Sequence, residues 1–389
     1  MSGYGPANLP YGVFRRPGEA ARVGARIGDS VLDLAALAAD GLLDDPAGAF
    51  AQPALNAFMA QGPSAWAATR ERLQRLVAGV DAEPPLVALD DVELLLPFVV
   101  ADYQDFWSSI HHASNSGRIF RPAAADPLPP NWRHMPIAYH GRSSTVVVSG
   151  TSVRRPHGQS RPSHDGGPVF GPSAKLDVEL ELGFVVGTPS EPGVPVAVDR
   201  ALDHLFGVVL LNDWSARDLQ AWESQPLGPF LGKSFATSIS AWVVPMAALA
   251  PFRAAPVTPP DPEPMAYLRE PPWGLDIALE IEINGHRVAA TNARELYWSV
   301  AQQLAHLTVN GAHVRTGDLI GSGTISGPER HERGSLLELS WNGAEPIALG
   351  DGGRRTFLED DDEVVLRGVA GTGADAVALG EVRGRVMGS

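Results

Sequence analysis

The sequence contains no cysteine and no long hydrophobic run. Without cysteine the chain can form no disulfide, no thiolate zinc site and no cysteine nucleophile. No apolar stretch reaches the length of a membrane span, and Met1-Ser-Gly-Tyr-Gly-Pro6 has neither the basic region nor the apolar core of a signal peptide. These absences predict a cytoplasmic protein that has no membrane partner.

Basic residues are scarce relative to acidic ones. Lys and Arg together number 30 against 45 for Asp and Glu, which gives a net charge of -15. This charge would repel nucleic acid and anionic membrane surfaces, so the composition argues against both as partners. The 389 residues are 44% hydrophobic, which is enough for one or two domains with a substantial core.

Turn residues divide the chain into short segments. The 41 glycines and 34 prolines suit short strands better than a helix bundle. Leu275–Ile283 alternates cleanly and predicts a hairpin turning at Asn284-Gly285. Short strands of a small sheet are predicted near the N-terminus, at Tyr11–Phe14, Val23–Ile27 and Val31–Leu34. A change of composition near Pro97 predicts two domains, 1–97 and 98–389, in a mainly β fold with α/β elements.

The segment Lys175–Leu182 has charged residues at odd positions and apolar residues at even ones. This period of two predicts a strand with one buried face. The other face carries Asp177, Glu179 and Glu181, and neighbours on one face of a strand lie about 7 Å apart. Carboxylates at that spacing repel one another unless water or a cation screens them. From the strand alone, a solvated face and a cation site remain equal alternatives.

A second strand, Phe206–Leu211, has no polar residue and is predicted to be buried on both faces. Asp213 follows its end. Arg217 and Gln220 come next, three residues apart, which places them on one face of a short helix. A carboxylate after a buried strand, followed by a guanidinium and an amide on one helix face, is typical of a functional site, although a surface arginine is the simpler alternative.

The glycine-rich stretch Leu227-Gly-Pro-Phe-Leu-Gly-Lys-Ser-Phe-Ala-Thr237 contains Lys233. Gly-Lys-Ser is also the end of a phosphate-binding loop. Here, however, Gly228 is one residue too close and Pro229 removes a backbone donor, so we exclude that loop. Lys233 is instead a candidate charge directed into a cavity.

Further candidates lie in two segments that are distant in sequence. Asp105–His112 looks helical, with its end residues seven apart on one face. His111 and His112 have no other ligand at metal spacing nearby, so a general base is favoured over a metal ligand. Ser335–Trp341 is predicted to be a strand, and it contains Glu338. The chain has no serine in a Gly-x-Ser-x-Gly elbow.

Several of these stretches resemble the fumarylacetoacetase family. The resemblance rests on long motifs in order along the chain: Asn8-Leu-Pro-Tyr-Gly-Val-Phe14, Asn212-Asp-Trp-Ser-Ala-Arg-Asp218, Leu227-Gly-Pro-Phe-Leu-Gly-Lys-Ser-Phe235 and Gly323-Thr-Ile-Ser-Gly-Pro-Glu329. It implies a small N-terminal SH3-like barrel, a larger C-terminal mixed β-sandwich-roll with a metal site at its mouth, and a homodimer. Members of this family carry out the last step of tyrosine and phenylalanine (homogentisate) catabolism.

The family's metal ligands fall on carboxylates of this chain, namely Asp105, Glu179, Glu181 and Asp213. An all-oxygen ligand set selects a hard cation, Mg²⁺ or Ca²⁺. Lys233 and Thr237 match positions beside the metal. Because an ammonium cannot bind a cation, the role expected of Lys233 is that of a charge, and Thr237 has a supporting one.

The resemblance also implies a reaction, the hydrolysis of a carbon–carbon bond in 4-fumarylacetoacetate to give fumarate and acetoacetate. His112 would be the general base, and Glu338, which is 226 positions away (338 minus 112), would orient it. The residues expected around the tetrahedral oxyanion are Arg217, Gln220 and Lys233.

Substrate-binding positions of the family fall on Arg121, Tyr139, Gln220 and Thr324. Two further positions depart, because Trp107 and Ser224 stand where the family has tyrosines. Tryptophan keeps the bulk and one donor but cannot accept a hydrogen bond, and serine leaves a hole. These departures concern substrate identity more than metal and water chemistry.

Two other functions remain as alternatives. One is a sister hydrolase that acts on another acylpyruvate or β-diketo acid, which a substrate panel would separate. The second is a non-catalytic calcium-binding scaffold protein, which predicts cation binding without turnover. The presence of both His112 and Glu338 argues against the scaffold.

Overall fold

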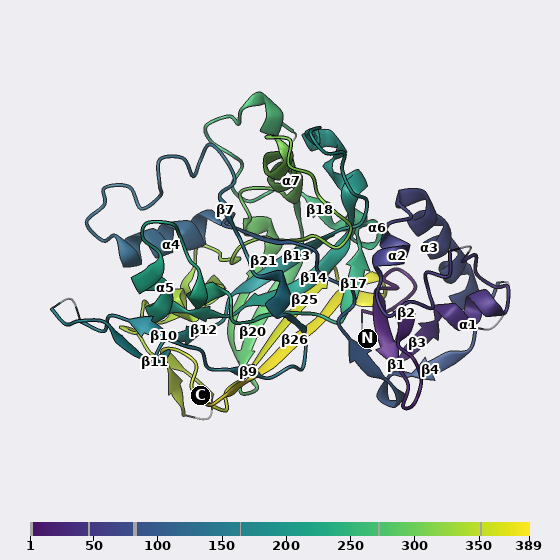
Figure 1. The fold of residues 1–389 in the computed structure, drawn as a ribbon, viewed down its shortest axis with the longest axis horizontal. Helices are drawn as coiled ribbons and strands as arrows, with labels where there is room; N and C mark the ends of the chain where they lie inside the picture. The colour runs from purple at the N-terminus through teal and green to yellow at the C-terminus, as the bar shows by residue number, and fades with distance from the viewer. Residues whose placement is uncertain (1–2, 46, 81–83, 164, 271–272, 351) are drawn as a thin grey trace.

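The computed structural model describes residues 3–45, 47–80, 84–163, 165–270, 273–350 and 352–389. The fold is mainly β, as expected, with a larger and a smaller sheet (Figure 1). The larger sheet has the order β4 (Leu86–Ala88), β3 (Ser30–Asp33), β2 (Arg22–Ile27), β1 (Tyr11–Arg15), β17 (Trp242–Pro245), β14 (Leu205–Asp213), β13 (Leu180–Val186), β22 (Leu319–Gly321), β6 (Tyr103–Phe106) and β7 (Ala138–His140). The smaller sheet has the order β21 (His286–Asn292), β20 (Ile277–Ile283), β25 (Glu363–Ala370), β26 (Val377–Met387) and β9 (Val153–Arg154).

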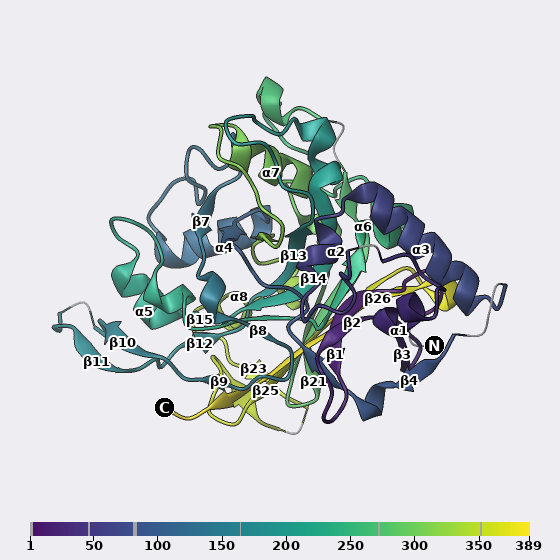
Figure 2. The same cartoon turned by 45° about the vertical axis from the view of Figure 1, so that its right-hand side comes forward.

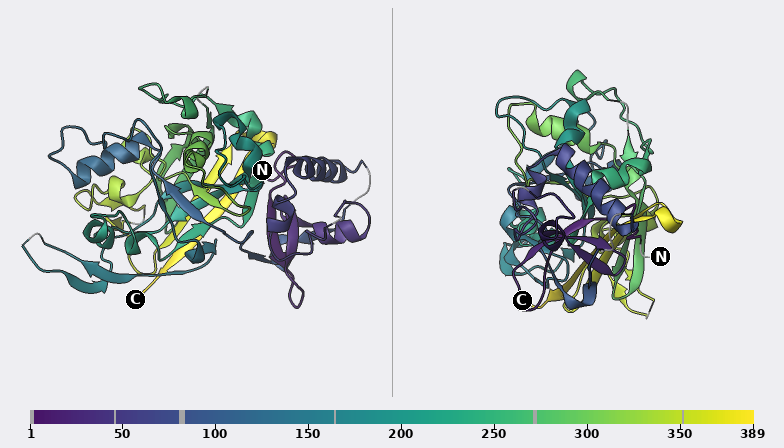
Figure 3. Two further views of the ribbon diagram at one scale, coloured as in Figure 1. Left: turned by 45° about the horizontal axis from the view of Figure 1, so that its top comes forward. Right: turned by 90° about the vertical axis from the view of Figure 1, so that its right-hand side faces the viewer.

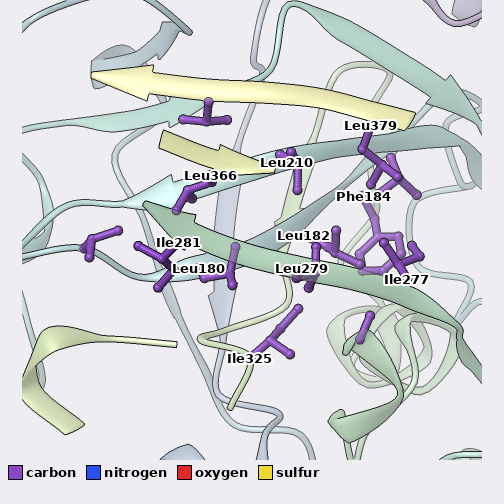
Figure 4. Close-up of a cluster of buried hydrophobic side chains, with 14 of the residues drawn as sticks. Leu180, Leu182, Phe184, Leu210, Ile277, Leu279, Ile281, Ile325, Leu366 and Leu379 are labelled. Carbon is purple, nitrogen blue, oxygen red and sulfur yellow. The ribbon is translucent and has the colours of Figure 1, made fainter. Parts of the chain in front are cut away.

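The two sheets bury a common apolar core. Leu180, Leu182 and Phe184 project from one face of β13 and belong to the same buried cluster as Ile277 and Ile281 of β20 (Figure 4). Full burial of each such side chain contributes about 1.5–3 kcal/mol. The prediction that the apolar residues of the alternating segment are buried is therefore confirmed. Because side chains alternate along a strand, Glu181 points to the opposite face of β13.

The polar residues of the alternating segment Lys175–Leu182 do not face solvent. Asp177, Glu179 and Glu181 are all buried, so a solvated strand face is wrong. The expected single strand is also interrupted, because β12 (Leu176–Asp177) pairs with β15 (Ser215–Ala216) whereas β13 begins at Leu180 and pairs with β14. The interruption lies next to Glu179, whose backbone amide instead donates to the side chain of Asn212 at 3.1 Å.

The N-terminal strands extend the larger sheet at one end of the molecule (Figure 3). Strand β1 pairs with β2, with β5 (Glu93–Leu95) and with β17. The helices of this region are α1 (Leu34–Ala39), α2 (Asn56–Met59) and α3 (Pro63–Val77). Their buried residues share a core with Val209 and Leu211 of β14. An SH3-like closure of these strands stays a prediction.

Two secondary-structure expectations near the site are wrong. Asp105 lies on β6 rather than on a helix, and α4 (Ile110–Phe120) begins only after Ser109, whose hydroxyl accepts from the His112 amide at 3.3 Å. Ser335–Trp341 is not a strand, because Ser335 caps the short helix α8 (Leu336–Leu339). The hairpin at Asn284-Gly285 is confirmed as β20 and β21.

The remaining helices are α5 (Arg217–Glu223), α6 (Met246–Leu249) and α7 (Val300–Thr308). A hairpin of β10 (His157–Ser160) and β11 (Val169–Pro172) extends away from the body beside α5 (Figure 2). Across the described ranges, no helix combines the length and the apolar character that crossing a membrane requires.

Candidate active site

Four buried carboxylates converge where neighbouring strands of the larger sheet meet. Asp105 lies on β6, Glu181 on β13 and Asp213 at the end of β14, and Glu179 directly precedes β13. Among the described residues, one oxygen of each of these carboxylates lies within 4.8 Å of the others. Since β22 runs between β13 and β6, a single strand separates Asp105 from Glu181, and Asp213 lies on the strand next to β13.

Gly321 of β22 provides the space between them. It is paired with Asp105 across the sheet. A Cβ atom at Gly321 would lie 3.1 Å from Asp105 Oδ1 and 3.2 Å from Glu181 Oε2. A side chain there would therefore crowd the carboxylates, and glycine leaves the cradle open.

The cluster has the properties of a cation site. Asp105 Oδ1 and Glu181 Oε1 are buried and have no hydrogen-bond partner among the described residues. Burial raises the pKa of Glu181 well above its usual value, and the charge of Asp105 adds to this. Burial likewise raises the pKa of Asp105, with Asp213 as the next cause. Buried, unpaired carboxylate oxygens fit a divalent cation, which would satisfy these oxygens and favour their ionised form.

Two cationic side chains of the protein contact the cluster. Lys233 Nζ donates to Asp213 Oδ2 at 2.6 Å and to Glu179 Oε2. Arg217 Nη2 donates to Glu179 Oε1 at 2.6 Å. Burial opposes ionisation of Glu179, but Arg217 and Lys233 outweigh it and hold its pKa below the usual value. If all four carboxylates are ionised, as a bound cation would favour, the two positive charges offset only half of their negative charge.

His112 lies beside the cluster and is bound by Glu338. Its Nδ1 is 2.6 Å from Glu338 Oε2, and its Nε2 is 3.8 Å from Glu179 Oε1. Burial opposes ionisation of Glu338, but His112 and the hydrogen bonds around the carboxylate outweigh it and lower the pKa of Glu338 to about 2. An ionised Glu338 requires a proton on Nδ1, which leaves Nε2 as the lone-pair nitrogen nearest the cluster.

Several other predicted residues also contact the cluster. Thr237 Oγ1 donates to Asp213 Oδ1 at 3.2 Å. The hydroxyl of Tyr139, predicted as a substrate position, lies 2.6 Å from Asp105 Oδ2 and 3.1 Å from Asp213 Oδ2. Gln220 Oε1 accepts from Arg217 Nη1 at 3.1 Å, so its amide is joined to the cluster through Arg217.

The remaining predicted positions contact parts of the protein other than the four carboxylates. Arg121 is exposed at the end of α4, and its guanidinium donates to the carbonyl of Pro127 at 2.7 Å. Ser224 ends α5, and its hydroxyl donates to the carbonyl of Gln220. Trp107 is half-buried just after β6, and its carbonyl accepts from Trp132 Nε1 at 2.9 Å. Thr324 is buried shortly after β22.

The sequence reasoning missed the residues that hold Glu338. Asn115 Nδ2 donates to Glu338 Oε1 at 2.9 Å, and the hydroxyls of Ser326 and Ser335 each donate to Oε2 at 2.9 Å. Asn115 follows His112 by three residues on a helix, so a shared helix face was an available signal. Ser326 gave no such signal, because its approach to Glu338 depends on the fold of the loop between β22 and α8.

Comparisons with known proteins agree with this arrangement. Residues 103–387 match the model described as "Fumarylacetoacetate (FAA) hydrolase C-terminal", and residues 7–97 match "Fumarylacetoacetase N-terminal". Proteins named fumarylacetoacetase are 48% identical in Caenorhabditis elegans, 46% in Arabidopsis thaliana and 45% in Homo sapiens. These matches cover 98% of this chain and 94–95% of the relatives.

Solved structures give the same fold at much lower identity. A fumarylacetoacetate hydrolase from Exiguobacterium antarcticum is 17% identical with a TM-score of 0.57, and the match covers 98% of this chain and 100% of that one. A maleylpyruvate hydrolase from Sphingobium is 16% identical with a TM-score of 0.55 and the same coverage. At this identity the likeness concerns the fold alone. The family models and the close relatives, taken with the geometry of the site, place this chain in the fumarylacetoacetase family.

Proposed function

We propose that this chain hydrolyses 4-fumarylacetoacetate to fumarate and acetoacetate, the last step of tyrosine and phenylalanine catabolism. The observation that carries the proposal is the His112–Glu338 pair, which lies with Nε2 of its imidazole 3.8 Å from a buried carboxylate cluster. A calcium-binding scaffold would need the carboxylates but not an oriented base. The names of the relatives support the substrate.

His112 is the general base in this proposal. Its Nε2 takes a proton from water, whose oxygen adds to the carbonyl carbon of the substrate. Glu338 keeps the Nδ1 proton in place and stabilises the imidazolium that forms. When the carbon–carbon bond breaks, its electron pair leaves with the acetoacetate fragment, which takes up the proton from the His112 imidazolium. The attacked carbon becomes the new carboxyl group of fumarate.

Charge on the substrate oxygens is met by the residues around the cluster. Asp105, Glu179, Glu181 and Asp213 would hold a divalent cation, Mg²⁺ or Ca²⁺, which supplies Lewis-acid polarisation of the substrate oxygens. Lys233 and Arg217 are held as fixed positive charges by their carboxylate partners, and Gln220 adds an amide donor. Donors fixed before the reaction stabilise an oxyanion without having to reorganise.

The test of the substrate is a panel assay with purified protein and Mg²⁺. We expect the highest kcat/KM for fumarylacetoacetate among diketo acids that include longer acylpyruvates. A wide preference for another member of the panel would replace this assignment with that of a sister hydrolase.

The resemblance to the family also supports proposals on domains, assembly and localisation. We propose two domains, 1–97 and 98–389, with the boundary near residue 97. We also propose a cytoplasmic homodimer with a small β-diketo acid as its ligand and with no nucleic-acid or membrane partner. The net charge of -15 supports the last point. Sedimentation of the purified protein measures the oligomeric state.

Glu338→Gln is expected to lower kcat, but by less than removal of His112. Glutamine keeps the size of the side chain and loses the charge that stabilises the imidazolium, while the base itself remains. The measurement is kcat for fumarylacetoacetate in both variants. A Glu338→Gln enzyme as active as wild type would show that His112 needs no charged partner.

Ser224→Tyr is expected to raise kcat/KM for fumarylacetoacetate. If the tyrosine hydroxyl reaches a substrate carboxylate, it restores a hydrogen bond to a charged group of about 1.5–3 kcal/mol, or about ten- to a hundred-fold. The matched control is Ser224→Ala, because the serine hydroxyl already donates to the carbonyl of Gln220 and its loss must be measured separately. If the tyrosine variant shows no gain over that control, residue 224 lies outside the substrate contacts.

A further inference from the structure

Asp177 is a buried carboxylate that the proposed reaction does not use. It is 0% exposed and lies on the polar side of the alternating segment, two residues before Glu179. Its Oδ1 accepts from the backbone amides of Val178 at 2.8 Å and Leu336 at 2.7 Å. Its Oδ2 accepts from Arg217 Nε at 2.7 Å and from the amide of Leu337 at 3.0 Å. Both oxygens are therefore engaged by other parts of the chain.

One set of these contacts fixes the start of α8. Leu336 and Leu337 are the first residues of that helix, and Glu338 follows them directly. A carboxylate that accepts the first amides of a helix satisfies groups without intrahelical partners. The position of Glu338, and through it the 2.6 Å contact with His112 Nδ1, thus depends on Asp177.

The other contact fixes the orientation of Arg217. Because a guanidinium is planar, holding Nε at Asp177 sets the direction of the other nitrogens. Nη2 then meets Glu179 Oε1 at 2.6 Å, and Nη1 meets Gln220 Oε1 at 3.1 Å. Asp177 therefore contacts both α8, which carries Glu338, and Arg217, which contacts Glu179 of the carboxylate cluster.

We propose that Asp177 is a positioning residue that sets the relative placement of the His112–Glu338 pair and the Arg217–Glu179 pair. It touches neither substrate nor cluster oxygen and acts through α8 and Arg217. This inference rests on the proposed function for its effect on turnover, although its geometric part does not.

The alternative is that Asp177 and Arg217 form a buried ion pair that contributes only to stability. A second buried aspartate–arginine pair in the chain provides a matched control. Asp362 is 1% exposed and accepts from Arg355 Nε at 2.8 Å, Arg355 Nη2 at 2.9 Å and Asn284 Nδ2 at 2.7 Å. It is thus a buried aspartate bound to an arginine, and none of these partners belongs to the site. Asp362→Asn therefore reports what the loss of such a pair does to stability alone.

The experiment compares Asp177→Asn with Asp362→Asn in two measurements. These are the steady-state kinetics, kcat and KM, for fumarylacetoacetate with Mg²⁺, and the NMR signal of the His112 Nδ1 proton in histidine-¹⁵N protein, assigned with His112→Gln. We expect Asp177→Asn to lower kcat about ten- to a hundred-fold, as is typical when a supporting partner of a site residue is removed. KM should change less, and the Nδ1 signal should shift. Asp362→Asn should leave kcat and the signal as in wild type.

An Asp177→Asn enzyme that keeps the wild-type kcat and Nδ1 signal would overturn the proposal. If that variant does not fold, Asp177→Ser, which is smaller and keeps an oxygen acceptor, is judged by the same criteria. Failure of both variants to fold would also overturn it, by making Asp177 a determinant of the fold. Because the NMR measurement needs no turnover, a wild-type protein inactive on fumarylacetoacetate would contradict the proposed function and leave this test intact.

Discussion

His112→Ala will lower kcat for fumarylacetoacetate by about a hundred- to ten-thousand-fold, which is the usual contribution of a general base. The expectation follows from the position of Nε2, which is 3.8 Å from Glu179, on a ring whose other nitrogen is held by Glu338. The variant should still fold and bind Mg²⁺, because His112 supplies no ligand to the carboxylate cluster. Steady-state kinetics and calorimetric titration with Mg²⁺ measure the two properties separately.

The matched control for this variant is His111→Ala. His111 is adjacent on α4, and its Nε2 is paired with Glu295 Oε2 at 3.3 Å rather than with the site. We expect that control to keep kcat within a few-fold of wild type. If His112→Ala stays equally close to wild type, another group is the base and the assignment of His112 is wrong.

Removal of divalent cations with a chelator will abolish turnover, and added Mg²⁺ or Ca²⁺ will restore it. The reason is the cluster of Asp105, Glu179, Glu181 and Asp213, which is buried and has carboxylate oxygens without protein partners among the described residues. Full turnover in EDTA, with no metal detected by elemental analysis, would contradict this expectation.

Glu181→Gln tests the same cluster by changing one of the proposed cation ligands. The substitution removes one full charge at the site, so cation affinity should fall. The control is Glu282→Gln, which removes a carboxylate paired with Arg367 at 2.6 Å on the smaller sheet. Equal cation affinity in Glu181→Gln and this control, measured by calorimetry, would exclude Glu181 as a ligand.

The parts of the fold that sequence could predict are those controlled by local pattern. The period of two in Lys175–Leu182 correctly gave the buried face of Leu180 and Leu182, because a strand alternates its side chains whatever lies around it. The same pattern could not decide between solvent and a cation site on the opposite face. That depends on β6, β14 and β22, which come from distant parts of the chain.

One of the two secondary-structure errors arose where a short apolar run had to be assigned. Leu336-Leu-Glu-Leu339 fits a strand or a helix equally well, and the observed choice follows from Ser335 and Asp177, which together satisfy the first amides of α8. Likewise the contact between His112 and Glu338 spans 226 positions and has no local signal. Resemblance to the family supplied that pair, and the structure brings the two side chains together.

The central claim is that this site cleaves a carbon–carbon bond of fumarylacetoacetate with the help of a bound cation. The most direct test is proton NMR of the substrate incubated with purified protein and Mg²⁺. The account predicts fumarate and acetoacetate in equal amounts, formed only when cation is present and not by His112→Ala. Unchanged fumarylacetoacetate, with Mg²⁺ binding to the same sample established by calorimetry, would contradict it.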